Sequence, residues 1–168
     1  MAEGEVFVFD GTSGGNPAGS VIFDLQGNLY GTATMGGVYN NGEVFELTPA
    51  SSGQWTETTI HSFTGLNGDG YSPQGDLAFD SSGHLYGTTS LGGTNAGLCH
   101  VNGCGIVYEL TPPASGKTWS EKVLHTFNLS TDGMEPFAGV ILDSAGKLYG
   151  TTSLGGSGNQ GTVFKVVP

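Results

Sequence analysis

Short runs of apolar, aromatic and threonine residues alternate along the whole chain with turns rich in glycine, asparagine and aspartate. Segments 55–63, 84–90 and 105–111 each have the ordinary length of a β-strand, and no stretch places apolar residues at helical spacing. Runs of this kind, bounded by turn residues, are typical of strands. Glycine accounts for 31 of the 168 residues, and it supplies the backbone freedom of tight turns while weakening helices. The pattern therefore predicts an all-β fold.

The same phrases recur three times in a fixed order. Leu-Tyr-Gly-Thr occupies residues 29–32, 85–88 and 148–151, each time after an Asp-x-x-Gly turn and before a glycine pair. The intervals between the three copies are 56 and 63 residues. A period of this length indicates a propeller, a solenoid or another repeat array.

A second phrase, Gly-x-Val-aromatic, begins at Gly42, Gly105 and Gly161, and there the intervals reverse to 63 and 56 residues. Seven extra residues therefore lie in one loop of the second repeat, and this loop contains Cys99 and Cys104. A disulfide between these cysteines would pin the loop. Two unpaired thiols are the alternative, because cytosolic proteins rarely keep disulfides.

Each repeat offers four strand-like segments, which predicts three four-stranded blades of a β-propeller. The segments are 5–10, 20–24, 28–35 and 42–48 in the first repeat, 55–63, 75–80, 84–90 and 105–111 in the second, and 119–127, 139–143, 147–153 and 161–167 in the third. The expected blades cover about 4–49, 50–112 and 113–168 of a single domain, 1–168. Segment 5–10 fits either the first strand of blade one or an overhanging fourth strand.

Three blades are too few to close a ring, because propellers ordinarily contain four to eight. Two copies of the chain would supply six blades, with blade three of each copy packed on blade one of the other. An open fan of three would leave the faces of its first and last blades uncovered. We therefore expect a homodimer in which each chain is half of a six-bladed ring.

The repeated phrases resemble a known family. Gly-Asn-Leu-Tyr-Gly-Thr at 27–32, Leu-Tyr-Gly-Thr-Thr-Ser-Leu-Gly-Gly at 85–93 and 148–156, and Gly-Thr-Val-Phe at 161–164 are similar to the GloVer tandem repeats, described as choice-of-anchor proteins of bacterial surfaces and secretions. The resemblance implies a propeller-like fold and an extracellular or cell-surface location, and it implies no catalytic residues. The chain shows no signal peptide, so a cytoplasmic protein or an excised fragment is the alternative.

The charge of the chain excludes several partners. Fifteen acidic residues face four lysines and no arginine, which gives a formal net charge of -11. Such a surface repels polyanions, so we expect no nucleic-acid partner and no anionic membrane partner. No apolar run is long enough to span a bilayer, so membrane insertion is not expected either.

Trp55 and Trp119 follow matching loops in the second and third repeats, where each loop meets a strand. Sugars stack on indole rings, so repeated tryptophans beside loops are candidates for a lectin-like site, and packing of the connection is the alternative. His84, in a turn, is a further candidate ligand-binding residue, although a single histidine carries little signal. These residues suggest neutral carbohydrate as a ligand.

Neither a cofactor nor a catalytic motif is expected. The oxygen-rich loops 67–73 and 131–136 could hold calcium, but neither has the full EF-hand pattern, and Asp-Gly turns explain both. No nucleophile elbow, zinc-binding helix motif or phosphate loop is present. The sequence thus favours a non-enzymatic binding or surface-display module. A self-assembling half-propeller without a ligand is the alternative, and a polysaccharide hydrolase or lyase using channel-facing carboxylates comes last.

Overall fold

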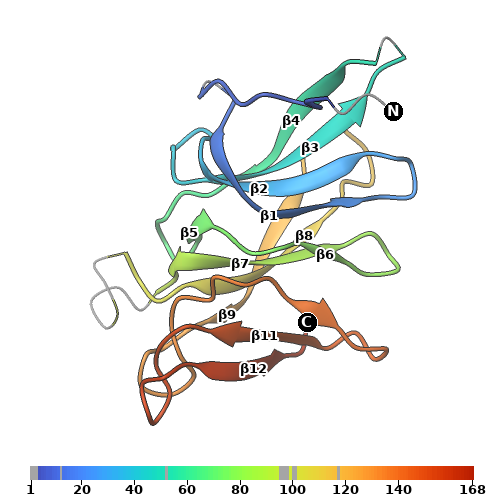
Figure 1. Cartoon of the computed structure of the whole chain (residues 1–168). Helices are drawn as coiled ribbons and strands as arrows, with labels where there is room; N and C mark the ends of the chain where they lie inside the picture. The colour runs from blue at the N-terminus through green and yellow to red at the C-terminus, as the bar shows by residue number, and fades with distance from the viewer. Residues whose placement is uncertain (1–3, 12, 52, 95–98, 100–101, 117) are drawn as a thin grey trace.

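The computed structural model describes residues 4–11, 13–51, 53–94, 99, 102–116 and 118–168 (Figure 1). The described residues form twelve strands and no helix, so the predicted all-β class is confirmed. The strands make three antiparallel sheets, none of them closed into a barrel, that lie one above another in Figure 1. Segment 4–11 lies beside the first sheet, and the C-terminal end lies beside the third.

The sheets follow one another along the chain. The first sheet contains, in spatial order, β1 (Gly15–Phe23), β2 (Leu29–Met35), β3 (Glu43–Pro49) and β4 (Trp55–Ser62). The second contains β5 (Gly70–Pro73), β7 (Leu85–Gly92), β8 (Ile106–Thr111) and β9 (Ser120–Thr126), with the short β6 (Ala78–Phe79) also paired to β7. The third contains β10 (Ile141–Leu142), β11 (Leu148–Thr152) and β12 (Thr162–Val166).

The strand that opens each later repeat completes the sheet of the repeat before it. We expected segment 55–63 to join the second repeat and segment 119–127 the third. That grouping is wrong, because β4 pairs with β3 and β9 pairs with β8. A repeat in sequence fixes the period of the strands, and it does not fix which strand comes first in a sheet.

Segment 5–10 is not a strand, contrary to the sequence prediction, because no other segment pairs with it among the described residues. Its aromatic side chains nevertheless have a fixed place. Phe7 and Phe9 pack against the first sheet, and the ring of Phe9 meets that of Phe45 edge to face at 5.0 Å. The segment is therefore held by its side chains rather than by a ladder of backbone hydrogen bonds.

The Asp-x-x-Gly phrase forms the hairpin turn before each central strand. In the second sheet, Oδ1 of Asp80 accepts the backbone N–H of Ser82 and of His84, while Oδ2 lies 3.2 Å from the hydroxyl of Tyr86. The first and third turns repeat this arrangement with Asp24 and Asp143. The carboxylate thus closes the turn and fixes the tyrosine that follows.

The glycine of Leu-Tyr-Gly-Thr makes room for an aromatic ring on the neighbouring strand. Gly31 pairs with Phe45, and a Cβ on Gly31 would stand 2.5 Å from that ring. Gly87 pairs with Tyr108 and Gly150 with Phe164 in the same way. The two repeated phrases are therefore one structural unit, in which a glycine on the central strand is covered by an aromatic side chain.

Most of the core lies between the sheets, and a smaller apolar cluster on the outer side of the first sheet is covered by Phe7 and Phe9. One apolar cluster joins Tyr30, Val44 and Ile60 of the first sheet to residues of the second that include Leu85. Another joins Tyr86 and Val107 of the second sheet to residues of the third that include Leu148. The second sheet therefore buries one face against the first sheet and the other against the third, as an inner repeat of a stack does.

Candidate functional site

Three equivalent valines show where the stack of sheets ends. Val44 of β3 and Val107 of β8 are fully buried, because the next sheet covers them. Val163 stands at the same position of β12, and 80% of it is exposed. The outer face of the third sheet therefore presents a side chain that the two inner sheets bury.

Three equivalent threonines repeat this contrast. The hydroxyl of Thr32 donates to the carbonyl of Ala18 in its own sheet at 2.9 Å, and it also lies 3.5 Å from the carbonyl oxygen of Gly75, in the loop before β6. The hydroxyl of Thr88 donates to the carbonyl of Ala138, in the loop before β10, at 2.8 Å. Thr151, their equivalent, is exposed. A hydroxyl that reaches the next sheet at each inner junction thus faces outward at the end of the stack.

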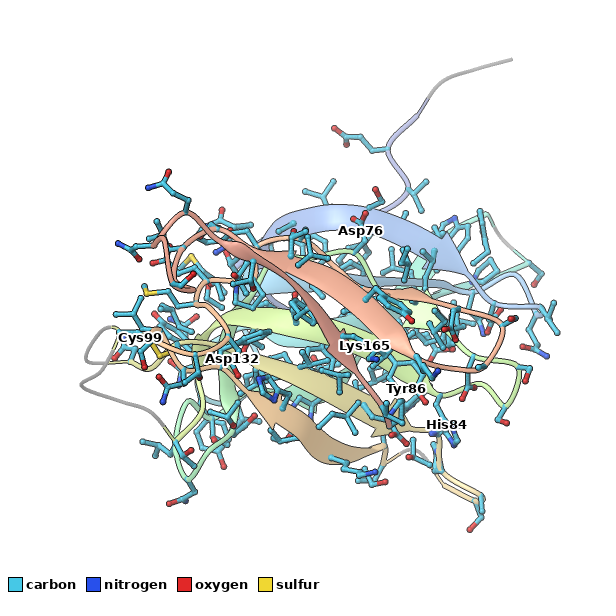
Figure 2. The ribbon with its side chains drawn as sticks, turned by 90° about the horizontal axis from the view of Figure 1, so that it is seen from below. Asp76, His84, Tyr86, Cys99, Asp132 and Lys165 are labelled. Atoms are coloured by element: carbon cyan, nitrogen blue, oxygen red, sulfur yellow. A yellow bond between two sulfur atoms is a disulfide. The ribbon has the colours of Figure 1, made fainter. Side chains whose placement is uncertain are left out.

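The third sheet gathers further side chains on the same outer face. Val163 pairs with Thr151, and Tyr149 pairs with both Ile141 and Lys165, so these five residues share one side of the sheet. Ile141 is exposed, and Lys165 stands on β12 in the view of Figure 2. We call these five residues, Ile141, Tyr149, Thr151, Val163 and Lys165, the last end face.

The first sheet exposes the side that, in the second and third sheets, is covered by the preceding sheet. Val21 is 49% exposed, whereas its equivalents Leu77 and Val140, each covered by the preceding sheet, are 4% and 3% exposed. Phe23, two residues further along β1, is also exposed. We call the outer side of the first sheet, carrying Val21, Phe23 and the half-buried Trp55, the first end face.

A charged cluster lies at the junction between the first and second sheets. Nε2 of His61 in β4 lies 3.9 Å from Oδ1 of Asp69 and 3.8 Å from Oε2 of Glu121 in β9. All three side chains are mostly buried. Their ligand atoms lie within 4.8 Å of one another, so the three residues could surround a small cation. The sequence prediction did not single out this group, because its members are far apart in the chain.

Burial sets the protonation of this cluster. Burial raises the pKa of Glu121 to about 7, and the neighbouring Asp69 adds to the increase, while the charge of His61 opposes it. Burial would also raise the pKa of Asp69. The His61 ring and the hydrogen bonds from Thr64 and Gly70 outweigh burial there, and the pKa of Asp69 falls below its usual value. Asp69 is therefore the ionised member, and Glu121 titrates near neutrality.

The equivalent histidine of the next repeat has a simpler environment. Nε2 of His125 lies 2.7 Å from Oδ2 of Asp132, and both side chains are about one-third exposed. Oδ1 of Asp132 accepts the backbone N–H of Asn128, just as Asp69 accepts that of Thr64. The two candidate calcium loops are thus closed by equivalent aspartates, Asp69 and Asp132, which supports the interpretation of both loops as turns. Calcium binding itself stays an untested prediction.

The two tryptophans occupy different surroundings. The ring of Trp119 meets that of Tyr30 edge to face at 6.1 Å and packs against the cluster between the first and second sheets. Trp55 lies on the first end face and lines a cleft of about 470 Å³ together with Gln54, Thr56 and residues of segment 5–8. Trp55 is therefore the better placed of the two to meet a ligand.

His84 belongs to the hairpin turn of the second sheet (Figure 2). Its Nδ1 lies 2.9 Å from Oδ2 of Asp80, and Asn28 bonds to Asp24 in the same position of the first sheet. The histidine therefore has a structural partner inside its own turn. Its predicted role as a ligand contact stays untested.

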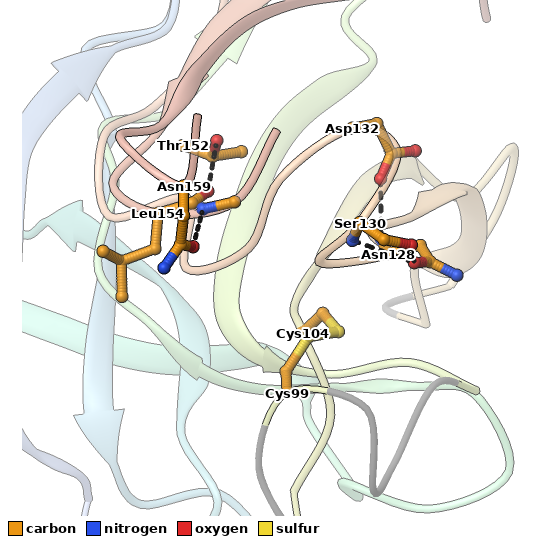
Figure 3. Close-up of a disulfide and its surroundings, with 9 residues drawn as sticks. Cys99, Cys104, Asn128, Ser130, Asp132, Thr152, Leu154 and Asn159 are labelled. Carbon is orange, nitrogen blue, oxygen red and sulfur yellow. Dashed lines mark hydrogen bonds between the residues drawn. A yellow bond between two sulfur atoms is a disulfide. The ribbon is translucent and has the colours of Figure 1, made fainter. Parts of the chain in front are cut away.

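Cys99 and Cys104 form a disulfide in the inserted loop of the second repeat (Figure 3). Cys104 is buried, and both cysteines pack against the cluster between the second and third sheets. The bond thus fastens the inserted loop where it meets the third sheet.

A groove of about 530 Å³ is lined by residues on or next to β1, β6 and β10, one strand from each of the three sheets. Its lining includes Asp76, whose Oδ1 accepts the backbone N–H of Ser20 at 2.5 Å. Among the described residues that line the groove, Asp76 supplies the carboxylate, whereas glycoside hydrolases ordinarily use a pair. The hydrolase or lyase alternative, which the sequence placed last, therefore gains no second acid from this groove.

Comparison with known proteins adds no family. No protein-family model matches the chain, and no curated protein matches it. The GloVer resemblance thus rests on the repeated phrases alone. Among the described residues, no helix is long and apolar enough to cross a membrane.

Proposed function

We propose that the chain is a self-assembling half-propeller, whose last end face packs on the first end face of a second copy. The proposal rests on one observation: Val163 is exposed where Val44 and Val107 are buried by the following sheet. A second copy would offer Val163 the same kind of surface that the second and third sheets offer to its equivalents. The three sheets then act as three blades, and two chains close a ring of six.

The two end faces have complementary apolar side chains. The last end face offers Val163 and Ile141, and the first end face offers Val21 and Phe23. Burying one such side chain is worth about 1.5–3 kcal/mol. A two-fold ring makes this contact twice, so the apolar gain is large enough to hold two chains together at micromolar concentration.

The polar contacts between adjacent sheets of one chain also predict polar contacts between the last end face and the first end face of a second copy. Thr32 lies against the carbonyl of Gly75 and Thr88 bonds that of Ala138, and Gly19 is the equivalent residue of the first sheet. The hydroxyl of Thr151 should therefore donate to the carbonyl of Gly19 in the second copy. Such a bond would help to select one orientation of the two chains.

Light scattering and sedimentation at micromolar concentration test the assembly. We expect twice the chain mass for the wild type and the single-chain mass for Val163→Asp and for Phe23→Asp, because each change places a charge in the contact. Val38→Asp is the matched control, since Val38 is 83% exposed and lies in a loop outside both end faces. A monomeric wild type would overturn the proposal.

A second candidate function, which is an alternative to ring closure because the ring would cover the first end face, is the binding of neutral carbohydrate at Trp55. The cleft beside Trp55 combines an indole ring with the polar side chains of Gln54 and Thr56, which is the composition of a sugar site. Calorimetric titration with a panel of neutral oligosaccharides should then give a signal that Trp55→Ala abolishes. Trp119→Phe, a change at the inner junction, should leave that signal intact. Absence of heat with every sugar would contradict this function.

A further inference from the structure

Segment 4–10 has the aromatic arrangement of the strand ends that complete the first two sheets. The rings of Phe9 and Phe45 lie 5.0 Å apart at 64°. Those of Phe63 and Tyr108 lie 5.1 Å apart at 63°, and those of Phe127 and Phe164 lie 4.9 Å apart at 66°. Because Phe45, Tyr108 and Phe164 are equivalent residues of the three sheets, Phe9 is the equivalent of Phe63 and Phe127.

The residue two places earlier supports the same alignment. Phe7 meets Phe9 edge to face at 5.1 Å, just as His61 meets Phe63 at 4.6 Å and His125 meets Phe127 at 4.9 Å. His61 is in β4, and His125 is in β9. Residues 4–8 therefore correspond to the last part of the strand that closes a sheet.

That strand is missing from the third sheet. β4 pairs with β3, and β9 pairs with β8. β12 is the counterpart of β3 and β8, and it has no partner on its outer edge among the described residues. Segment 4–8, in contrast, has the residues of a closing strand, but among the described residues no strand pairs with it. The chain thus carries an unpaired edge at one end and an unpaired closing segment at the other.

We propose that residues 4–8 of one chain add to β12 of a second copy as its fourth strand. This inference rests on the proposed two-chain ring, and it names the element that completes each third sheet. Each chain would complete the third sheet of the other, so the exchange is made twice around the two-fold axis.

The first and second sheets, which β4 and β9 complete, predict the register of this addition. His61 pairs with Val44 and His125 with Val107, so Phe7 should lie opposite Val163 of the second copy. Ile60 and Leu124 are the extra residues of a bulge in β4 and β9, and Val6 takes that place here. The added strand therefore contains a bulge as well.

One backbone hydrogen bond marks the point where a closing strand leaves its sheet. The N–H of Phe63 donates to the carbonyl of Gly42, and that of Phe127 donates to the carbonyl of Gly105, both at 3.0 Å. The corresponding pair is the N–H of Phe9 and the carbonyl of Gly161 in the second copy. Because Phe9 is already packed on the first sheet, the segment is held in position before the second copy arrives.

Cysteine cross-linking tests the register. In the variant that combines Phe7→Cys and Val163→Cys, oxidation should join two chains covalently, and most of the protein should run as a dimer without reductant. The matched control combines Phe7→Cys with Val38→Cys, because Val38 is as exposed as Val163 and has no place in the proposed pairing. Both variants keep the native disulfide. Circular dichroism of each should match the wild type before oxidation.

The outcomes separate this inference from the proposed function. A cross-linked dimer in the first variant and none in the control supports strand addition. A wild type of double mass whose variant gives no cross-link between chains overturns strand addition and leaves the ring in place. A wild type of single-chain mass overturns both.

Hydrogen exchange of the wild type gives a second test that needs no substitution. Amides of residues 4–8 and of β12 should become protected together when the protein is raised from nanomolar to micromolar concentration. Unchanged exchange in these two segments, in a sample that dimerises, would overturn strand addition.

Discussion

The inner junction on β8 and the outer face on β12 place the same kind of residue in opposite surroundings. Val107 lies between two sheets and is fully buried, whereas Val163 stands at the same point of the repeat and faces outward. Thr88 and Thr151 differ in the same way, since the first bonds the next sheet and the second is exposed. The repeat thus places the side chains of a junction on β12 even though no sheet of the described residues covers them.

The largest effect should come from trimming the two valines. Val107→Ala removes two methyl groups from a filled junction and should lower the free energy of unfolding by about 2–3 kcal/mol at any protein concentration. Val163→Ala should cost almost nothing at nanomolar concentration, where the chain is alone. At micromolar concentration it should cost as much as Val107→Ala if the face is covered by a second copy. Urea unfolding at the two concentrations measures both.

Equal costs for Val107→Ala and Val163→Ala at nanomolar concentration would contradict the contrast between the two regions. A cost for Val163→Ala that stays near zero at micromolar concentration would instead show that the last end face remains bare.

The charged cluster at the first junction should give a pH-dependent effect. The pKa of Glu121 rises from 4.5 to about 7 on folding, so the folded state holds its proton more tightly. The stability that Glu121 contributes is thus fully present below about pH 4.5 and is lost as the pH rises through 7. Glu121→Gln should therefore raise stability by about 2 kcal/mol at pH 8 relative to the wild type, and by little at pH 4.

Thermal unfolding at the two pH values measures this difference. Glu5→Gln, which changes an exposed carboxylate, is the control, compared at nanomolar concentration so that segment 4–8 is not in contact with a second copy, and it should show no such dependence. A Glu121→Gln protein with the same relative stability at pH 4 and pH 8 would show that burial does not perturb this carboxyl.

The smallest effect should come from the threonines. Thr88→Val leaves the carbonyl of Ala138 without its donor and should cost about 1 kcal/mol, because a partly buried hydrogen bond across the junction is lost. Thr151→Val should be neutral in the isolated chain and costly only at concentrations where two chains meet. Denaturant midpoints at low and high protein concentration distinguish these cases, and a cost for Thr151→Val at nanomolar concentration would argue against an uncovered face.

The local parts of the fold could be predicted from sequence because their causes are local. The Asp80 turn and the strand that follows it depend on residues only a few positions apart. The role of the glycines was harder to foresee, since Gly87 and Tyr108 lie twenty-one positions apart in the chain and meet only because β7 pairs with β8. The sequence showed both phrases without showing that one fills the space left by the other.

Membership of sheets could not be predicted, because a periodic sequence has no marked beginning. β4 has the residues of a strand wherever it pairs, and only the hydrogen bonds to β3 assign it to the first sheet. The cluster of His61, Asp69 and Glu121 escaped prediction for the same reason. Its members come from a strand, a loop and the closing strand of the next sheet, so their meeting depends on how sheets stack.

β4 and β9 each begin a repeat in the sequence but complete the sheet of the repeat before it. This arrangement has a consequence for how such genes can grow by duplication. A duplication that copies one whole repeat copies a closing strand for the preceding unit together with the hairpins of its own. Inserting such a unit between two repeats leaves segment 4–8 and the outer edge of β12 as they are, whatever the number of copies. If two chains close a ring as proposed, recombination between repeats would change how many chains the ring requires and would keep the same way of joining them.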